Sequence, residues 1–315
     1  MSTKIGLLLP TRELAMAGDF GTSSLLTIAQ EAESVGYDSL WTGDSLTARR
    51  RLDPFVVLSA VASVTDRIGL GTAALTAALR HPVMSANIIA SLDRHTNGRL
   101  ALAVGAGFPV PESEDEFAAV GVPFKERVGR LDETVRMWRA IWGGERQAFE
   151  GKYWTSDKHD QLIPPAKLGG PRLWLAGSDT PKVIDRVARH YDGWLPFLPT
   201  PESYRRAWDR IAASAEKHGR PEGAITPGMY ATVVVNKDRK AARDELDAYL
   251  KSYYGRPLEV MSTFQAYCYG SAEECADWLL EYAAAGCQHM VVRNATSGTR
   301  SGLAELLLEF RERVG

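Results

Sequence analysis

The sequence predicts an α/β fold, a (β/α)8 TIM barrel with a short hairpin insertion and an irregular late loop. Short apolar runs alternate with segments of helical spacing along nearly all of the 315 residues. The apolar runs lack polar alternation, as expected for parallel strands that are covered on both faces. No Pro- or Ser-rich linker divides the chain, which favours a single domain over residues 1–315.

One βαβ unit at residues 67–107 shows this pattern most clearly. Apolar strands are predicted at 68–75 and 100–104, and a helix at 83–95 connects them. Both strands end in small residues, where a flat ligand has room to approach bare backbone.

The other elements follow in the same alternating order. Strands are predicted at residues 4–9, 38–42, 171–176, 192–197, 229–235 and 289–293. Helices are predicted at 25–35, from 53 onward, and at 125–142, 181–191, 202–218, 239–254, 272–285 and 303–313. The hairpin is predicted within 147–165, and loops after residue 9, at 108–122 and at 255–270. An open doubly wound sheet is the alternative, but no GxGxxG opens a helix after a strand.

The composition argues against several classes of function. The chain is 45% hydrophobic and 24% charged with a net charge of −2, so no nucleic-acid footprint is expected. No apolar run approaches the roughly 20 residues of a membrane span, and the amino terminus does not resemble a cleavable leader. These features predict a cytoplasmic protein without a nucleic-acid or membrane partner.

The cysteines and histidines predict neither disulfides nor a metal site. Cys268, Cys275 and Cys287 form no CxxC motif, which fits buried thiols in a reducing compartment. The six histidines are scattered and form neither HxH nor HExxH, so no metal cofactor is expected.

Functional groups of a barrel lie just after the carboxyl ends of its strands. That position is occupied here by Pro10, Thr11, Asp44, Ser45, Ala73, Ala74, Leu75, Gly105, Ala106, Gly107, Phe108, Gly177, Ser178, Asp179, Thr180, Phe197, Arg293 and Asn294. The set is poor in acid–base groups and rich in small residues. It favours a flat cofactor that brings its own reactivity over hydrolytic chemistry.

Two segments with polar side chains each allow two interpretations. Residues 177–180 open a helix, so their N–H groups either hold a phosphate or form a plain turn capped by Ser178 or Thr180. Asp44 is either a functional acid or a loop residue engaged in a cap or a salt bridge.

The basic residues near these segments also allow more than one interpretation. The arginines at 49–51 either attract an anionic ligand or form a solvated loop. Arg80 and His81 are expected to pair with nearby acids or to cap the helix that follows them.

Several short motifs follow one another along most of the chain. They are GYDSLW at 36–41 leading to Asp44, LGT at 70–72, RHP at 80–82, NGRL at 97–100, VGAG at 104–107, AGS at 176–178 and DGW at 192–194. In this order the motifs resemble those of the luciferase-like flavin-dependent oxidoreductases. That family includes bacterial luciferase, alkanesulfonate monooxygenase and the coenzyme F420-dependent dehydrogenases and reductases.

The resemblance implies a barrel whose flavin or deazaflavin ring lies at the carboxyl ends of the strands. It implies a non-prolyl cis peptide bond between Ala73 and Ala74, against the ring. Asp44 is then the candidate catalytic residue, at the ring edge, where it positions or protonates the reacting group. Ala106 and Gly107 are implied to lie beside it.

The resemblance also implies a phosphate site and two departures. Gly177, Ser178 and Thr180 are implied to bind the cofactor phosphate. Many members carry a histidine where this chain has Ser45, and the F420-dependent dehydrogenases often carry a glutamate where it has Phe108.

The function that we expect is hydride transfer between coenzyme F420 and a small organic substrate. One alternative is an FMN-dependent monooxygenase that uses O2 and reduced FMN from a partner reductase. Another is a flavin-binding protein without turnover. Related barrels often form homodimers, so a second copy of the chain and a flavin or F420 reductase are the partners that the resemblance suggests.

Overall fold

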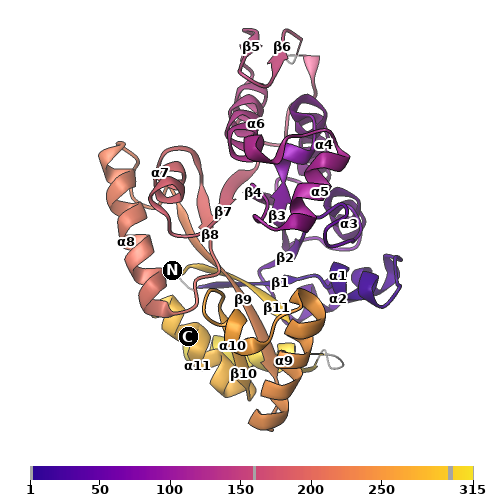
Figure 1. Ribbon diagram of the computed structural model, residues 1–315, viewed down its shortest axis with the longest axis vertical. Helices are drawn as coiled ribbons and strands as arrows, with labels where there is room; N and C mark the ends of the chain where they lie inside the picture. The colour runs from indigo at the N-terminus through magenta and orange to yellow at the C-terminus, as the bar shows by residue number, and fades with distance from the viewer. Residues whose placement is uncertain (1–2, 159–160, 297–300, 315) are drawn as a thin grey trace. The chain divides into compact units, whose positions relative to one another are not determined.

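The structure is a computed structural model that describes residues 3–158, 161–296 and 301–314. In these residues, eight parallel strands alternate with helices along the chain (Figure 1). The predicted (β/α)8 barrel is confirmed. The barrel strands are β1 (Lys4–Leu8), β2 (Ser39–Thr42), β3 (Gly69–Thr76), β4 (Leu100–Gly105), β7 (Arg172–Ala176), β8 (Gly193–Leu195), β9 (Thr226–Val235) and β11 (His289–Asn294).

The remaining elements surround or interrupt this alternation. The helices are α1 (Thr11–Met16), α2 (Ser23–Val35), α3 (Pro54–Ala62), α4 (Pro82–His95), α5 (Pro111–Ala119), α6 (Arg127–Trp142), α7 (Pro181–His190), α8 (Pro201–Lys217), α9 (Arg239–Tyr254), α10 (Leu258–Met261), α11 (Ala272–Ala284) and α12 (Ser301–Val314). Short 3-10 turns are η1 (Ala77–Leu79) and η2 (Phe124–Glu126), and the further strands are β5 (Phe149–Glu150), β6 (Thr155–Ser156) and β10 (Tyr267–Gly270).

The chain groups into two compact units. Unit 1 contains Met1–Leu8, Ala32–Leu40 and Trp174–Gly315, and unit 2 contains Leu9–Glu31 and Trp41–Leu173. Each unit has its own buried apolar residues, and each is described by itself below.

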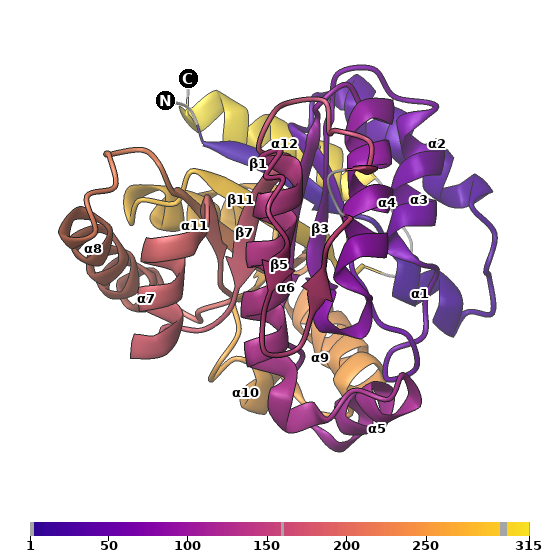
Figure 2. The same cartoon turned by 90° about the horizontal axis from the view of Figure 1, so that it is seen from above.

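In unit 2, β3 and β4 form a parallel pair whose register shifts between Ala73 and Leu75. The peptide bond between Ala73 and Ala74 is cis, as predicted. Helix α4 packs against α3 and α6 beside these strands (Figure 2). On β3, a side chain at Gly71 would bring its Cβ within 2.5 Å of the Trp41 ring, so only glycine fits there.

Two segments of unit 2 that were predicted as loops form helices. Helix α5 lies within residues 108–122, and α1 follows Pro10. In α5, Pro111 occupies the first helical position, Glu112 and Glu114 lie in the first turn, and Phe117 is buried. The prediction was wrong because proline and acidic residues are compatible with a helix start, where no N–H is lost and the dipole favours negative charge.

The predicted hairpin insertion is confirmed as the antiparallel pair β5–β6. The buried carboxylate of Glu133 on α6 holds its turn. This carboxylate accepts hydrogen bonds from the N–H groups of Lys152, Tyr153 and Trp154 at 2.8, 2.8 and 2.7 Å. The insertion is therefore fixed to α6 through its main chain.

In unit 1, β11 lies between β9 and β1, and all pairings are parallel. The segment 255–270, predicted to be irregular, contains α10 and the strand β10, which pairs with the last residues of β9. A ten-residue β9 extends far enough to accept this extra strand. An apolar cluster joins α9 and α10 to the ends of β9 and β11 through Val234, Leu246, Leu250, Leu258 and Ala295.

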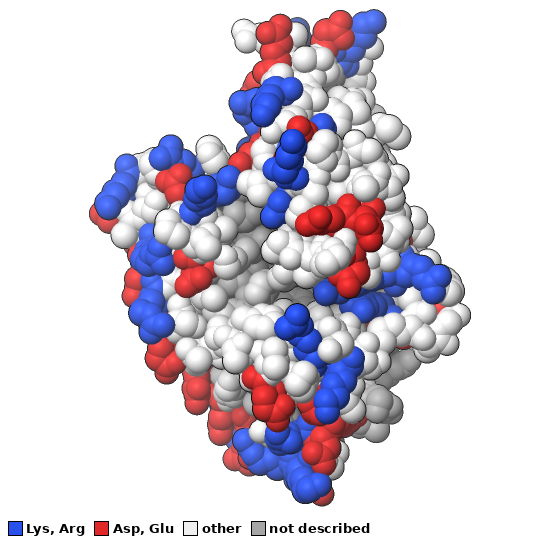
Figure 3. All heavy atoms as spheres, in the orientation of Figure 1, with Lys and Arg blue, Asp and Glu red and all other residues white. Residues whose placement is uncertain are grey.

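The surface carries charges of both signs. Lysine and arginine side chains are interspersed with aspartate and glutamate on the face drawn in Figure 3. Among the helices of the described residues, none has the length and apolarity that a bilayer span requires.

His289, at the start of β11, makes the stability of the protein depend on pH. Its Nε2 lies 2.7 Å from the Ser39 hydroxyl, and its ring contacts the Trp174 ring with centroids 5.2 Å apart. Desolvation lowers the pKa of His289 to about 4, whereas the pKa of a histidine in the unfolded chain is about 6.5.

Between these two pH values the unfolded chain binds a proton that the folded protein does not bind, so stability falls as the pH is lowered. We expect a loss of up to about 3 kcal/mol from this group. Urea unfolding at several pH values should show a flatter profile for His289→Gln over that window. The exposed control His218→Gln should keep the wild-type profile, and a His289→Gln profile with the wild-type slope would contradict this assignment.

Candidate functional site

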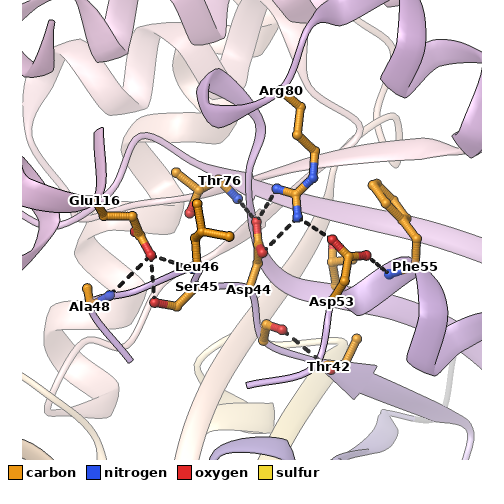
Figure 4. A network of polar contacts seen from close by, with 12 residues as sticks. Thr42, Asp44, Ser45, Leu46, Ala48, Asp53, Phe55, Thr76, Arg80 and Glu116 are labelled. Atoms are coloured by element: carbon orange, nitrogen blue, oxygen red, sulfur yellow. Dashed lines mark hydrogen bonds and ion pairs between the residues drawn. The ribbon is translucent and has the colours of Figure 1, made fainter. Parts of the chain in front are cut away.

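Asp44 lies at the carboxyl end of β2, where Gly43 separates it from the last strand residue. Its side chain is only 3% exposed and accepts hydrogen bonds from Arg80 Nη1 at 2.6 Å and Nη2 at 2.9 Å. It also accepts from the main-chain N–H of Thr76 at 2.9 Å (Figure 4). The carboxylate therefore ties the end of β2 to the end of β3 through charge-assisted bonds.

Arg80 extends this network to a third element. Its Nη2 also donates to Asp53 at 2.8 Å, while Asp53 caps α3 by accepting from the N–H of Phe55 at 2.8 Å. Burial alone would lower the pKa of Arg80, but hydrogen bonds and charge from Asp44 and Asp53 outweigh it and raise that pKa above its usual value. Arg80 thus pairs with nearby acids, the first of the two roles considered for it.

The three bonds to Asp44 determine what its carboxylate can do. Both oxygens are engaged, and one of them fixes Thr76, two residues beyond Ala74. Such a carboxylate supplies a fixed negative charge and a fixed strand end. Its assignment as a catalytic residue stays a prediction, and the geometry favours positioning over proton transfer.

Thr76 also adjoins the end of β4. It pairs with Gly105, and a Cβ added at Gly107 would lie 4.0 Å from Thr76 Cγ2 and 3.1 Å from the ring of Phe117. Gly107 has a φ of 84°, a conformation that favours glycine. Ala106 directly precedes Gly107, and both are half-buried.

Glu116 on α5 shapes the loop that follows Asp44. Glu116 is only 4% exposed, and its Oε1 accepts from the Ser45 hydroxyl at 2.8 Å. The same oxygen accepts from the N–H groups of Leu46, Thr47 and Ala48. Ser45, which replaces the histidine of many family members, therefore contacts a buried acid.

Sequence reasoning missed Glu116 because residues 108–122 were predicted to be a loop. A usable signal was present, since Glu116 and Phe117 follow a first-turn proline and two acids at helical spacing. The partner loop lies about 70 residues earlier in the chain, however, and no local pattern indicates that distance.

The predicted phosphate site lies in unit 1, between β7 and α7. The Gly177 carbonyl accepts from Trp194 Nε1 at 3.1 Å, and a Cβ at Gly177 would lie 3.1 Å from Val183. Thr180 is the N-cap residue of α7, and its side chain makes no cap hydrogen bond in the described chain. Ser178 is half-buried in the same turn. The phosphate-binding role of Gly177, Ser178 and Thr180 stays a prediction.

Within the residues that the structure describes, no group of three or more His, Cys, Asp or Glu side chains is arranged to hold a metal ion. The three cysteines are free thiols, and Cys275 and Cys287 are buried.

The Glu116 contacts generate a stability prediction. Replacing Glu116 with Gln removes a buried charge from four hydrogen bonds, so we expect the 45–48 loop to loosen at a cost of about 2 kcal/mol. Limited trypsin digestion, which cuts after Arg49, Arg50 or Arg51, should then proceed faster than in the wild type.

The control for this experiment is Glu112→Gln, which removes an exposed acid from the same helix. It should keep the wild-type digestion rate. Equal protection of residues 49–51 in both variants would contradict the role of Glu116.

Known proteins are similar in sequence to a large part of this chain. An F420-dependent glucose-6-phosphate dehydrogenase of Nakamurella multipartita is 32% identical over 243 residues, covering 73% of this chain and 69% of the relative. A phthiodiolone/phenolphthiodiolone dimycocerosates ketoreductase of Mycobacterium tuberculosis is 26% identical over 245 residues, covering 69% of this chain. The match spans 62% of the length of the ketoreductase.

A solved structure shares the fold of this chain, and a family model matches most of its sequence. An F420-dependent secondary alcohol dehydrogenase, solved in complex with an F420-acetone adduct, superposes with a TM-score of 0.83 at 20% identity, covering 99% of this chain and 100% of that one. The model of the luciferase-like monooxygenase family matches residues 3–289. Because that match includes the network around Asp44 and nearly all of the barrel, the chain belongs to the luciferase-like monooxygenase family.

Proposed function

We propose that this protein is an oxidoreductase that transfers a hydride between coenzyme F420 and a small organic substrate. The observation that carries the proposal is the row of small residues at the ends of the paired strands β3 and β4, together with the bond that ties the end of β3 to the Asp44–Arg80 pair. The F420 dependence of the Nakamurella multipartita relative supports the choice of cofactor.

The residues at these strand ends fit a flat ring. Ala73, Ala74 and Ala106 have short side chains and are half-buried, so they are open to a ligand in part. Gly107 leaves a space that a Cβ would fill against Phe117. When bound, F420 would accept or donate a hydride through its own ring, while the chain supplies the binding surface.

In this proposal each polar residue has a binding or orienting task. Asp44 keeps the end of β3 and its own negative charge in one place, so that the reacting group meets a preorganised site. Gly177, Ser178 and Thr180 bind the cofactor phosphate at the start of α7. A separate reductase would supply reduced cofactor, and a homodimer is the proposed assembly.

A second candidate is an FMN-dependent monooxygenase that uses reduced FMN and O2. Phe108 favours it, because an apolar residue replaces the glutamate that is common in F420-dependent dehydrogenases. Phe108 is 44% exposed just beyond β4, where it can exclude water from a ligand.

Titration of the purified apoprotein separates these candidates. If the proposal is right, F420 binds at least about tenfold more tightly than FMN, a difference of about 1.4 kcal/mol. Quenching of cofactor fluorescence measures both affinities. Tight FMN binding without F420 binding would exclude the F420 proposal, and a bound cofactor that no substrate reoxidises would favour a binding protein without turnover.

Asp44→Asn tests the positioning role. Breaking one partner of this nearly buried pair leaves Arg80 with Asp53 alone, so we expect a loss of about 3 kcal/mol in stability. We also expect a fall of at least about a hundredfold in the rate of hydride transfer. Urea unfolding and single-turnover absorbance measurements give the two values.

The matched variant is Asp53→Asn, because it removes the second partner of Arg80 while leaving the Asp44 pair intact. It should retain most of the hydride-transfer rate. If Asp44→Asn retains both cofactor affinity and turnover, the role assigned to Asp44 is wrong.

A further inference from the structure

Arg293, near the carboxyl end of β11, is an arginine buried among tyrosines within unit 1. The residue as a whole is only 2% exposed. The guanidinium carbon lies 5.2, 5.8, 4.5 and 5.4 Å from the ring centroids of Tyr230, Tyr249, Tyr253 and Tyr254. Tyr230 belongs to β9, and the other three lie in the last turns of α9. We call these four side chains the tyrosine box.

The hydrogen bonds of Arg293 are incomplete. Nη1 donates to the Tyr249 hydroxyl at 3.2 Å, and Nη2 donates to the Tyr254 hydroxyl at 2.7 Å. Nε is buried and makes no hydrogen bond to any residue that the structure describes. No carboxylate of the described residues forms an ion pair with this guanidinium. Arg80 in unit 2 differs in this respect, since two acids neutralise it.

A buried cation without an anion is costly. Moving a guanidinium out of water is repaid only when its charge and its donors find partners. Aromatic faces and two neutral hydroxyls repay part of that cost. The charge itself persists, because a guanidinium is not deprotonated in proteins. The tyrosine box is therefore a positive site that lacks its strongest complement, an oxyanion.

The unused donor lies on the edge of the guanidinium that suits an oxyanion. Nε and Nη2 point their N–H bonds in the same direction and together bind two oxygens of a carboxylate or phosphate. Within the part of the chain that the structure describes, this edge has one hydrogen-bond partner, the Tyr254 hydroxyl on Nη2. An oxyanion that replaces this one hydroxyl gains both donors.

The neighbourhood of Tyr254 permits that replacement. Tyr254 is the last residue of α9 and is half-buried, and Gly255 follows it with a φ of 70°. One side of the tyrosine box is thus formed by the last residue of a helix, and the glycine that follows it has more backbone conformations available than other residues. Arg293 itself lies at the end of a barrel strand, where ligands bind in this fold.

We propose that Arg293 binds the oxyanion group of a small-molecule ligand, a carboxylate or a phosphate, through Nε and Nη2 in place of the Tyr254 hydroxyl. This site is additional to the phosphate site proposed at residues 177–180. The anion belongs either to the substrate or to an acidic group of the cofactor, and both present the same chemistry to the guanidinium.

The test measures binding of inorganic phosphate and of formate to the full-length apoprotein, by calorimetry, against chloride at equal ionic strength. Wild-type protein should bind the oxyanions in preference to chloride. Arg293→Met should weaken binding at least about tenfold, and Tyr254→Phe should strengthen it about threefold because the competing hydroxyl is gone. The control Arg130→Met removes an arginine that contacts Tyr153 and Trp154 but pairs with Glu126, and it should change nothing.

Two results would overturn the proposal: no preference of the wild type for oxyanions over chloride, or equal affinities in Arg293→Met and wild type. If Arg293→Met does not fold, Tyr254→Phe decides, since an unchanged affinity in that variant contradicts the displacement of its hydroxyl. Titration of Arg293→Met with F420 and FMN identifies the source of the anion. A tenfold loss of cofactor affinity assigns it to the cofactor, and an unchanged cofactor affinity assigns it to the substrate. None of these binding measurements depends on hydride transfer.

Discussion

The bidentate pairing of Asp44 with Arg80, together with the bond from the Thr76 N–H, is the interaction on which unit 2 depends. It joins the ends of β2 and β3 to the start of α3 through Asp53. Thr76 at the end of β3 still pairs with Gly105 of β4, and the Asp44 carboxylate adds a side-chain contact to its N–H. The small residues Ala73, Ala74 and Ala106 at these strand ends are half-buried.

Carboxylates order two other loops of unit 2 in the same way. Glu116 collects three main-chain N–H groups and the hydroxyl of Ser45, and Glu133 collects three N–H groups of the hairpin turn. Each acid is buried on a helix and compensates loop donors that would otherwise lack partners. Arg293 shows the reverse arrangement, since it is a buried cation whose hydrogen-bond acceptors among the described residues are two neutral hydroxyls.

Local signals were sufficient for most of the fold. Apolar strands, the Asp53 cap with its following proline, and the small residues at strand ends are all encoded within a few positions. The cis bond at Ala73 and Ala74 followed from the family resemblance. Helix α5 was missed because its proline and acids have two meanings, and Glu116 and Arg293 were not assigned roles because their partners lie tens of residues away. Burial and pairing depend on tertiary contacts that a sequence pattern does not contain.

The most direct measurement of the central claim is a crystal structure of the protein with bound F420. We expect the deazaflavin ring to lie against Ala73 and Ala74, next to Ala106 and Gly107, with the pairing of Asp44 and Arg80 unchanged. We also expect the cofactor phosphate at Gly177, Ser178 and Thr180. A ring bound away from the ends of β3 and β4, or FMN in that position from a crystal grown with both cofactors, would contradict this proposal.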